Sequence, residues 1–83
     1  MHVIYILRGK KDQYLYTGLT KNLRRRLREH NTGRVKPTKA HTPLEVVYVE
    51  KFKTRKEARF REKFFKSGSG RELRNSILNN IPR

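Results

Sequence analysis

The chain begins with HVIYILRGKKDQYLYTGL (residues 2–19), in which two apolar runs flank a short polar segment. The first run, residues 2–9, is rich in β-branched and aromatic side chains and ends on Gly9, which is typical of a β-strand. The second run, residues 14–19, has the same character, and the polar segment around Asp12 predicts a turn. We therefore expect the two runs to pair as an antiparallel hairpin.

A basic segment follows the hairpin and carries the signals of a helix over residues 23–30. Asn22 precedes it as a suitable N-cap, and Gly33 lies where the chain would leave the helix. Residues 31–43 combine turn formers with basic side chains. A loop of this length in a small domain is usually functional or mobile.

One more strand and two more helices are predicted in the second half of the chain. The run LEVVYVEKF, residues 44–52, alternates well enough to be a third strand. The sequences TRKE at residues 54–57 and SGRE at residues 69–72 read as capping boxes, and each predicts the start of a helix. The first helix should reach about Lys66, and Pro82 should end the second.

The order strand, strand, helix, strand, helix, helix predicts an α+β fold, in which a small three-stranded antiparallel sheet is flanked by helices. The chain has 83 residues, which is the size of one domain with a thin core. It shows no repeat, low-complexity tract or linker that would divide it, so residues 1–83 should form a single domain.

Charge is the strongest signal in the composition. Lys and Arg total 22 against 7 Asp and Glu, which gives a net charge of +15. Such self-repulsion does not help folding, whereas a polyanionic partner relieves it and gains affinity from the release of counterions. The composition therefore favours nucleic acid as the partner over a membrane surface or an acidic protein.

Cysteine content and hydropathy limit the remaining classes of protein. The chain has no cysteine, which excludes disulfides and Cys-based metal sites. The N-terminal apolar run, residues 3–7, is too short for a signal peptide or a membrane span. We therefore expect a soluble, cytoplasmic protein that does not contact a membrane.

The few acidic residues can be given structural roles before a catalytic role is considered. Glu29 can pair with an arginine of its own helix, and Asp12 suits the hairpin turn. Glu45 and Glu50 lie at solvent-exposed strand ends, and Glu57 and Glu72 belong to the two capping boxes. Glu62 is left over. At about 100° per residue it borders the helix face that carries Ala58 and Phe65. There it is either the partner of an arginine or a metal-binding carboxylate.

The helix over residues 23–30 points one guanidinium toward its apolar side. Arg26 shares a face with Leu23, Leu27 and His30, whereas the neighbouring arginines face elsewhere. Taken singly, Arg26 is a phosphate contact or a salt-bridge residue, and His30 is a phosphate contact or a satisfied polar residue. A lone tyrosine on a strand is more often a packing residue than a catalytic one.

Taken together, these segments resemble a known family. VIYIL followed by YTG, and then by NLRRRLREHNTG and TRKEARFREKFFKSGSGRE, is similar to the GIY-YIG nucleases. The resemblance is strongest to the short single-domain bacterial members related to the nuclease domain of the excinuclease subunit UvrC, and it runs from Val3 to Leu73. Val3 and Thr17 depart from the two tyrosine motifs, as in other small members, and Leu19 stands where the UvrC-type domain has a lysine.

The resemblance implies a three-stranded antiparallel sheet flanked by helices, metal-dependent cleavage of DNA phosphodiester bonds, and a role in DNA repair. By position, the residues that it implies in catalysis are Tyr5, Tyr16, Arg26, His30 and Glu62, with Gly18 and Asn75 in support. Glu62 is the implied metal ligand. The expected cofactor is one divalent cation, Mg²⁺ or Mn²⁺, because a single carboxylate can hold Mg²⁺ together with substrate phosphate and water. No small-molecule cofactor is expected.

The chemistry suggests a role for each of these groups. The planar guanidinium of Arg26 can grip two phosphate oxygens and stabilise developing charge. Tyr16 is the first choice for the group that takes the proton of the attacking water, with Tyr5 hydrogen-bonded nearby, but the sequence does not decide between them. Either phenol would need a pKa below its usual value of about 10, which neighbouring cations can provide. His30 can orient a tyrosine or the phosphate, or pass a proton.

DNA is the expected substrate, recognised by its backbone and shape, with branched, nicked and damaged forms and also RNA left open as targets. Seven basic residues of the helix and the following loop are expected to contact phosphate, namely Arg24, Arg25, Arg28, Arg34, Lys36, Lys39 and His41. Two alternatives remain. One is a nucleic-acid-binding module with the same fold and no turnover, and the other is a ribosome-associated RNA binder.

Overall fold

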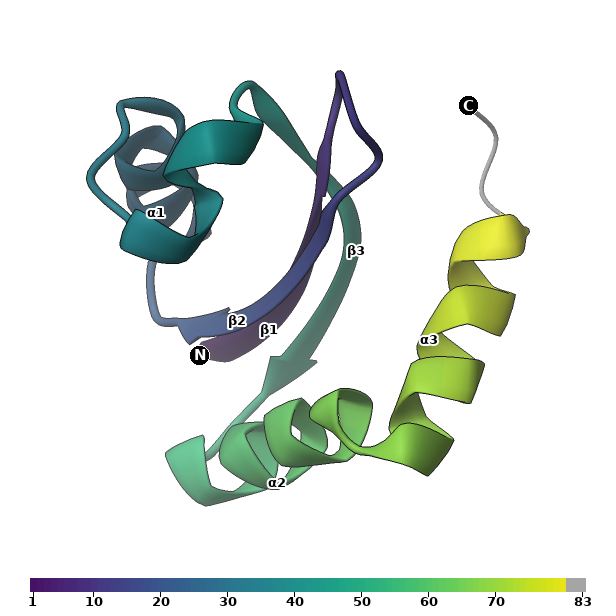
Figure 1. The fold of residues 1–83 in the computed structure, drawn as a ribbon. Helices are drawn as coiled ribbons and strands as arrows, with labels where there is room; N and C mark the ends of the chain where they lie inside the picture. Colours follow the sequence, from purple (N-terminus) through teal and green to yellow (C-terminus); the bar gives the residue numbers. More distant parts are fainter. Residues whose placement is uncertain (81–83) are drawn as a thin grey trace.

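Three strands form the centre of the molecule in the computed structural model, which describes residues 1–80 (Figure 1). They are β1 (His2–Gly9), β2 (Leu15–Thr20) and β3 (Leu44–Phe52). Both neighbours of β1 run antiparallel to it, and the strand order is β2-β1-β3. The three strands and their antiparallel pairing agree with the prediction from the sequence.

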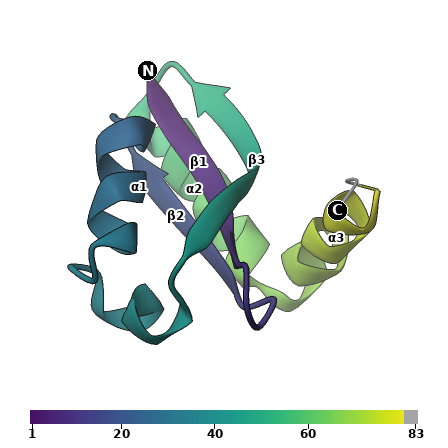
Figure 2. The ribbon, with the colours of Figure 1, turned by 90° about the horizontal axis from the view of Figure 1, so that it is seen from above.

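Helices cover both faces of this sheet. They are α1 (Leu23–Asn31), α2 (Arg55–Lys66), α3 (Gly68–Asn79) and a short 3₁₀ helix, η1 (Lys36–His41). In Figure 1, α1 and η1 lie on one side of the curved sheet, and α2 and α3 lie below it and on its other side. Seen from above, the strands again separate α1 from α3 (Figure 2). The predicted α+β fold is confirmed.

Burial on both faces distinguishes β1, the central strand. Ile4 packs with Ala58 and Phe65 of α2. Tyr5 and Leu7 belong to a second core on the side of α1. A strand that is buried on both faces reads as a continuous apolar run, which explains the sequence of β1. Because side chains alternate between the faces, Tyr5 points to the face opposite Ile4, which is the face that α1 covers.

The hairpin between β1 and β2 has the register that the site requires. Tyr5 lies opposite Gly18 in the antiparallel ladder. The turn is closed by Asp12, whose Oδ1 accepts a hydrogen bond from the backbone N–H of Tyr14 at 3.1 Å. Gln13 adopts a positive φ of 63° in this turn. The hairpin and the role of Asp12 are therefore confirmed.

Side-chain caps define the starts of α1 and α2. Asn22 Oδ1 accepts from the backbone N–H of Arg25 at 3.0 Å. Thr54 Oγ1 accepts from the N–H of Glu57 at 3.2 Å, and its hydroxyl donates to the Glu57 carboxylate at 2.9 Å. Both starts agree with the prediction, because these caps depend on neighbours in the sequence.

The start of α3 differs from the prediction. The helix begins at Gly68 with Ser67 as its N-cap, and Ser67 Oγ accepts from the N–H of Gly70 at 3.2 Å. The predicted capping box at residues 69–72 is therefore wrong. Gly70 is buried in the first turn of α3, where a Cβ would collide with the backbone carbonyl of Phe64. The close approach of α2 and α3 at Gly70 thus sets the start of α3. Its N-cap is Ser67, two residues before the predicted cap.

Glu50 also differs from the prediction that it is exposed to solvent. Its side chain is 22% exposed and accepts two hydrogen bonds from Arg61, at 2.8 and 3.1 Å. The hydroxyl of Tyr48 donates to the same carboxylate at 2.7 Å. The prediction failed because α2 packs over this end of β3, which the sequence of the strand does not reveal.

Two further findings complete the fold. The predicted long loop contains η1, so part of residues 31–43 is ordered helix. Among residues 1–80, the helices are all too short or too polar to cross a membrane. The predicted end of α3 at Pro82 lies outside the described residues.

Candidate active site

Tyr5 lies across Gly18 on the side of the sheet that α1 covers. The Tyr5 side chain is almost fully buried, at 1% exposure. An ideal Cβ placed on Gly18 would lie 2.8 Å from Cε1 of Tyr5 and closer still to its hydroxyl. The phenol therefore occupies the space that a side chain at position 18 would need. This close approach gives Gly18 a physical reason to be glycine.

His30 anchors the phenol of Tyr5 from α1. The imidazole is fully buried, with its Nε2 2.9 Å from the Tyr5 hydroxyl and its Nδ1 2.8 Å from Thr38 Oγ1. Thr38 also donates to the backbone carbonyl of Val35 at 3.3 Å. If the threonine hydrogen is used in this way, its oxygen accepts from Nδ1–H, and Nε2 accepts from the phenol. We call Tyr5, His30 and Thr38 the buried chain.

Thr38 is a residue that the sequence analysis missed. It is fully buried in η1, within a segment predicted to be a basic loop. Its neighbours Lys36 and Lys39 are exposed, as expected for phosphate contacts. One buried hydroxyl among exposed cations gives no periodic signal in so short a helix, and only the tertiary position of η1 reveals its contact with His30.

The titration properties of the buried chain follow from its burial. Burial raises the pKa of Tyr5 to about 12, and the adjacent guanidinium of Arg26 opposes this effect without overcoming it. Burial, followed by repulsion from Arg26, lowers the pKa of His30, with Glu29 opposing. Neighbouring cations were expected to lower a tyrosine pKa, but desolvation dominates at Tyr5. Phenol and imidazole are therefore both neutral near pH 7.

Arg26 lies at the boundary between the buried chain and solvent. Its side chain is 36% exposed, and Nη1 donates to Glu29 Oε1 at 3.1 Å. This ion pair confirms that Glu29 serves an arginine of its own helix. The guanidinium also affects the pKa of both Tyr5 and His30. It therefore faces the phenol while it remains accessible to a ligand.

Tyr16 is the more accessible of the two predicted catalytic tyrosines. It is half-buried on β2, and its ring centroid lies 5.0 Å from that of His30 and 6.3 Å from that of Tyr5. The three rings form one aromatic cluster, in which only Tyr16 reaches the surface. β2 is an edge strand of the sheet, so this surface is open.

Glu62 of α2 acts on the Tyr5 phenol through its charge. Its side chain is 15% exposed, and Oε2 lies 3.4 Å from Nζ of Lys66. Its negative charge contributes to the raised pKa of Tyr5, so the carboxylate lies within electrostatic reach of that phenol. Among residues 1–80, no three His, Asp or Glu side chains group around a common point. A single carboxylate beside a surface for phosphate suits Mg²⁺, which retains water ligands.

A basic hollow of about 260 Å³ adjoins Tyr16 at the outer side of β2. The residues that line it are Tyr14, Leu15, Tyr16, Thr17, Lys66, Arg71 and Arg74. Thr17 Oγ1 and Arg74 Nε are buried there, and neither has a hydrogen-bond partner among the described residues. The sequence analysis did not select Lys66, Arg71 or Arg74 as binding residues. The predicted end of α2 at Lys66 was correct, but the sequence did not reveal that α2 and α3 bring these cations to one surface beside β2.

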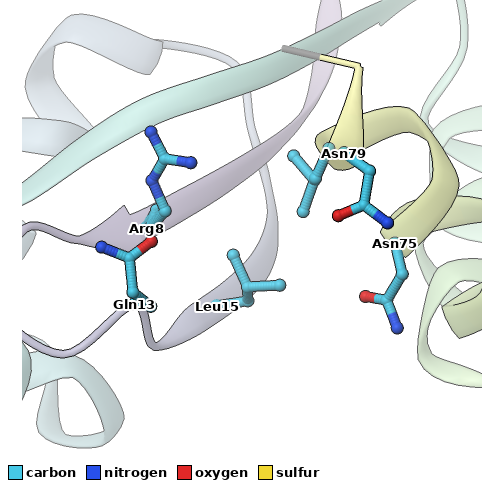
Figure 3. A pocket seen from close by; sticks show the side chains of 6 residues that line it. Arg8, Gln13, Leu15, Asn75 and Asn79 are labelled. Atoms are coloured by element: carbon cyan, nitrogen blue, oxygen red, sulfur yellow. The ribbon is translucent and has the colours of Figure 1, made fainter. Parts of the chain in front are cut away.

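Asn75, predicted to support the site, lines a different hollow. This hollow has a volume of about 120 Å³ and lies between α3 and the turn end of the hairpin (Figure 3). Arg8, Gln13 and Leu15 face Asn75 across it. Among the described residues, Asn75 forms no contact with Tyr5, Tyr16 or His30.

The predicted phosphate contacts separate into two groups. Arg25, Arg28 and Arg34 line a surface hollow of about 350 Å³ beside α1, and Arg24 is exposed on the same helix. His41 behaves differently, because its ring stacks on Tyr14 at 3.7 Å and its Nδ1 lies 2.5 Å from Asp12. His41 therefore contacts and stabilises the hairpin turn, although it was predicted as a phosphate contact.

The paired tyrosine strands, with an arginine and a histidine on the next helix and a glutamate on α2, define a nuclease domain of the GIY-YIG class. The family model of the GIY-YIG catalytic domain matches residues 1–75, and the chain belongs to this family. Members of the family are endonucleases that generally use divalent metal ions. The resemblance inferred from the sequence is thereby confirmed.

Similar proteins carry the description UPF0213. One from Oceanobacillus iheyensis is 52% identical over 58 residues, which cover 69% of this chain and 66% of the relative. One from Clostridium perfringens is 43% identical over 67 residues, which cover 80% and 71%. The solution NMR structure of a UPF0213 protein from Bacillus halodurans matches with a TM-score of 0.54 and 33% identity, covering 92% of this chain and 83% of that chain.

Proposed function

We propose that residues 1–83 form one catalytic domain, a metal-dependent endonuclease that hydrolyses DNA phosphodiester bonds. One observation carries this proposal: a single acid, Glu62, lies within electrostatic reach of the Tyr5 phenol in a strongly cationic molecule. A protein that only binds DNA gains nothing from a carboxylate at the phosphate surface, because it repels the ligand. Membership of the GIY-YIG family supports the same conclusion.

Arg26 is the residue that would bind the scissile phosphate. Its guanidinium is partly exposed and is held by Glu29. A planar guanidinium can donate two parallel hydrogen bonds to phosphate oxygens and stabilise the charge that develops there. Because Glu29 already orients the side chain, less conformational freedom is lost when the phosphate arrives.

Tyr16 would accept the proton of the attacking water. The pKa of about 12 makes Tyr5 a poor base near neutral pH, and its proton is already donated to His30. Tyr16 is half-buried beside the basic hollow, where water and phosphate have access. Lys66, Arg71 and Arg74 line this hollow and supply the positive charge around Tyr16. Tyr5 and His30 would then hold the geometry around it.

Glu62 would hold the metal ion, Mg²⁺ or Mn²⁺. A divalent cation bound there would neutralise charge on the phosphoryl oxygens and assist the leaving oxygen. Lys66 lies 3.4 Å from the carboxylate and would orient it before metal arrives. A single carboxylate gives weak affinity without DNA, because substrate phosphate supplies further ligands.

The basic surface would bind the DNA backbone without reading sequence. Exposed cations on α1 and the following segment, and those of the hollow beside Tyr16, surround the open side of the site. These are side chains for phosphate contacts, which position a duplex without selecting bases. We infer selectivity for the shape of the DNA, with branched, nicked or damaged forms as candidates and DNA repair as the setting.

A cleavage panel tests the proposal. Supercoiled plasmid and blunt, nicked, branched and single-stranded DNA are incubated with protein in Mg²⁺ or Mn²⁺, with EDTA as the blank. Glu62→Gln should lower cleavage about 10³-fold, because it removes the only proposed metal ligand. Glu45→Gln, which removes an acid that pairs with Arg8 at 3.3 Å, should retain activity.

The same panel contains the result that would reject the enzyme. Binding of DNA without cleavage of any substrate in either metal ion would leave a nucleic-acid-binding module with a nuclease fold. The net charge of +15 favours that second function if turnover is absent. Equal cleavage by the wild type and Glu62→Gln would show that the hydrolysis comes from a contaminant or from another site.

A further inference from the structure

An exposed phenylalanine stands on α2, where it also borders a hollow that Phe52 at the end of β3 lines. Phe60 is 77% exposed, whereas Phe64 and Phe65 of the same helix are partly or fully buried. Lys56, Arg59 and Lys63 share a surface hollow of about 270 Å³ with it. We call Lys56, Arg59, Phe60 and Lys63 the Phe60 patch. A large exposed aromatic side chain costs hydration free energy, so its position needs an explanation.

The cations of the Phe60 patch are available for a ligand. Within residues 1–80, none of Lys56, Arg59 and Lys63 forms a salt bridge or a side-chain hydrogen bond, and all three are exposed. Arg61, on the other flank of Phe60, is already engaged by Glu50 at 2.8 Å and stacks over the Phe65 ring at 4.5 Å. The available positive charge therefore lies on one side of Phe60.

That side of α2 leads to the candidate metal ligand. At about 100° per residue, Phe60 and Glu62 lie about 160° apart around the helix axis. The side chains that occupy the arc between them are, in order from Glu62, Arg55, Lys66, Arg59, Lys63 and Lys56. The opposite arc contains Glu57, which serves the N-cap, and the engaged Arg61. A continuous basic face thus connects the proposed cleavage site to one exposed aromatic ring.

The chemistry of this face selects one class of ligand. Unpaired DNA offers phosphates for cations and flat base faces for an aromatic ring, and base–aromatic stacking does not depend on sequence. A duplex offers phosphates only, because its bases are already stacked on one another. An apolar protein segment would leave three ammonium and guanidinium groups desolvated around Phe60, which is costly.

We propose that the Phe60 patch binds the unpaired nucleotides of a DNA strand that leaves the cleavage site, with one base stacked on Phe60. The proposal rests on the proposed function and extends it, because it names the feature that makes the substrate structure-selective. A DNA with an unpaired extension gains a stacking contact that a blunt duplex cannot make. Lys63 and its neighbours hold the phosphates of the extension.

Binding measured without metal tests this inference separately from catalysis. Fluorescence anisotropy in EDTA compares a blunt duplex of about 18 bp with the same duplex that carries a single-stranded extension of about six nucleotides. The wild type should bind the extended DNA more tightly. Phe60→Leu keeps the apolar bulk and removes the π-face, and it should reduce affinity for the extended DNA about tenfold while the blunt duplex changes less than about twofold.

A charge variant provides an independent readout. Lys63→Gln should lower the salt dependence of binding to the extended DNA by about one phosphate contact. The matched variant Lys11→Gln removes the same charge at the hairpin turn, at the other end of the molecule from α2 (Figure 1). It should leave the preference for the extended DNA unchanged.

The inference fails if Phe60→Leu weakens both DNAs equally or neither of them. It also fails if wild type sediments as a dimer that Phe60→Leu dissociates, because the patch would then be a contact between copies of the chain. Phe60 is exposed, so the circular dichroism melting temperature should not fall in the variant, and a large drop would contradict its assignment as a surface residue. An inactive protein that still prefers extended DNA would retain this inference and reject only the nuclease.

Discussion

The two halves of the candidate site differ in how far their geometry is fixed before DNA arrives. In the buried chain, Tyr5 and His30 are 1% and 0% exposed and are joined by a 2.9 Å hydrogen bond. In the open half, Arg26 is 36% exposed, and the 15% exposed Glu62 has a single ion pair at 3.4 Å. The first half is part of the core, and the second is part of the surface.

Because of this difference, we expect the buried chain to contribute to folding stability and the open half to contribute to catalysis. Removing a buried hydrogen-bonded group leaves its partner unsatisfied in a dry environment, which costs folding free energy. Removing an exposed charged group costs little stability, because water and salt already screen its ion pairs. Variants of the buried chain should therefore lose stability first, and variants of the open half should lose activity with the fold intact. Four predictions test this division.

Arg26→Ala should have the largest effect and should appear only in catalysis. We expect cleavage to fall about 10³-fold, equivalent to about 4 kcal/mol of transition-state stabilisation, because the charge-stabilising donor is lost. Unfolding by urea should change by less than about 0.5 kcal/mol. Arg24→Ala, at an exposed position on the same helix, should reduce cleavage only severalfold. Equal losses in the two variants would mean that Arg26 acts only as a general phosphate contact.

Gly18→Ala should disturb both halves at once. The new Cβ would overlap the Tyr5 ring, which the buried chain prevents from moving aside, so we expect a loss of about 2 to 3 kcal/mol in the free energy of unfolding. Gly68→Ala is the matched control, because a Cβ at this first residue of α3 would have no neighbouring atom within 4 Å. That variant should be neutral or slightly stabilising. A stable and fully active Gly18→Ala would show that the Tyr5 ring can relocate.

Thr38→Val tests the end of the buried chain. Valine has nearly the same shape and leaves Nδ1–H of His30 without an acceptor, which should cost about 1 to 2 kcal/mol of stability. Thr17→Val is the control, since Thr17 is also buried and its hydroxyl has no partner among residues 1–80. Its replacement should be neutral or stabilising. Chemical denaturation measures the free energy of unfolding of the two variants. Equal losses in both would refute the role of Thr38.

The smallest of the four predicted effects is the contribution of His30 to the pH dependence of stability. Its folded-state pKa lies below the unfolded value of 6.5, so at lower pH the unfolded chain takes up a proton that the folded chain does not. The free energy of unfolding should therefore fall between pH 7.5 and 5.5, by at most about 1.4 kcal/mol per pH unit for this proton. His30→Gln should flatten that slope more than His2→Gln, which also removes a histidine with a lowered pKa. An unchanged slope in His30→Gln would assign it to other groups.

The sequence predicted those features that depend on neighbours along the chain. Runs of β-branched and aromatic residues identified the first two strands and alternation the third, and Asn22 and Thr54 identified two helix starts through contacts within one turn. Helix periodicity placed Arg26 and His30 on one face, but the family resemblance was needed to assign them and Tyr5 to the site. Glu62 required the family resemblance as well, because its spacing also fits an ordinary salt bridge with Lys66.

The features that the sequence did not predict depend on contacts between distant elements. Thr38 acts through His30, Glu50 is covered by α2, and Gly70 is buried against the carbonyl of Phe64. Asn75 lines a hollow opposite Arg8 and Gln13 of the hairpin. In each case the deciding partner lies on another secondary-structure element, and the local pattern of residues carries no record of it.

The hydrogen-bond direction within the buried chain has a consequence for the flow of protons. Starting at the phenol, each hydroxyl or ring N–H points to the next acceptor, and the last acceptor is the backbone carbonyl of Val35. An amide carbonyl accepts a hydrogen bond but is far too weak a base to take up a proton. With the Thr38 hydrogen donated to Val35, the row of donors ends at a group that cannot take up a proton. A proton released in the proposed cleavage would then leave through the solvent-facing side.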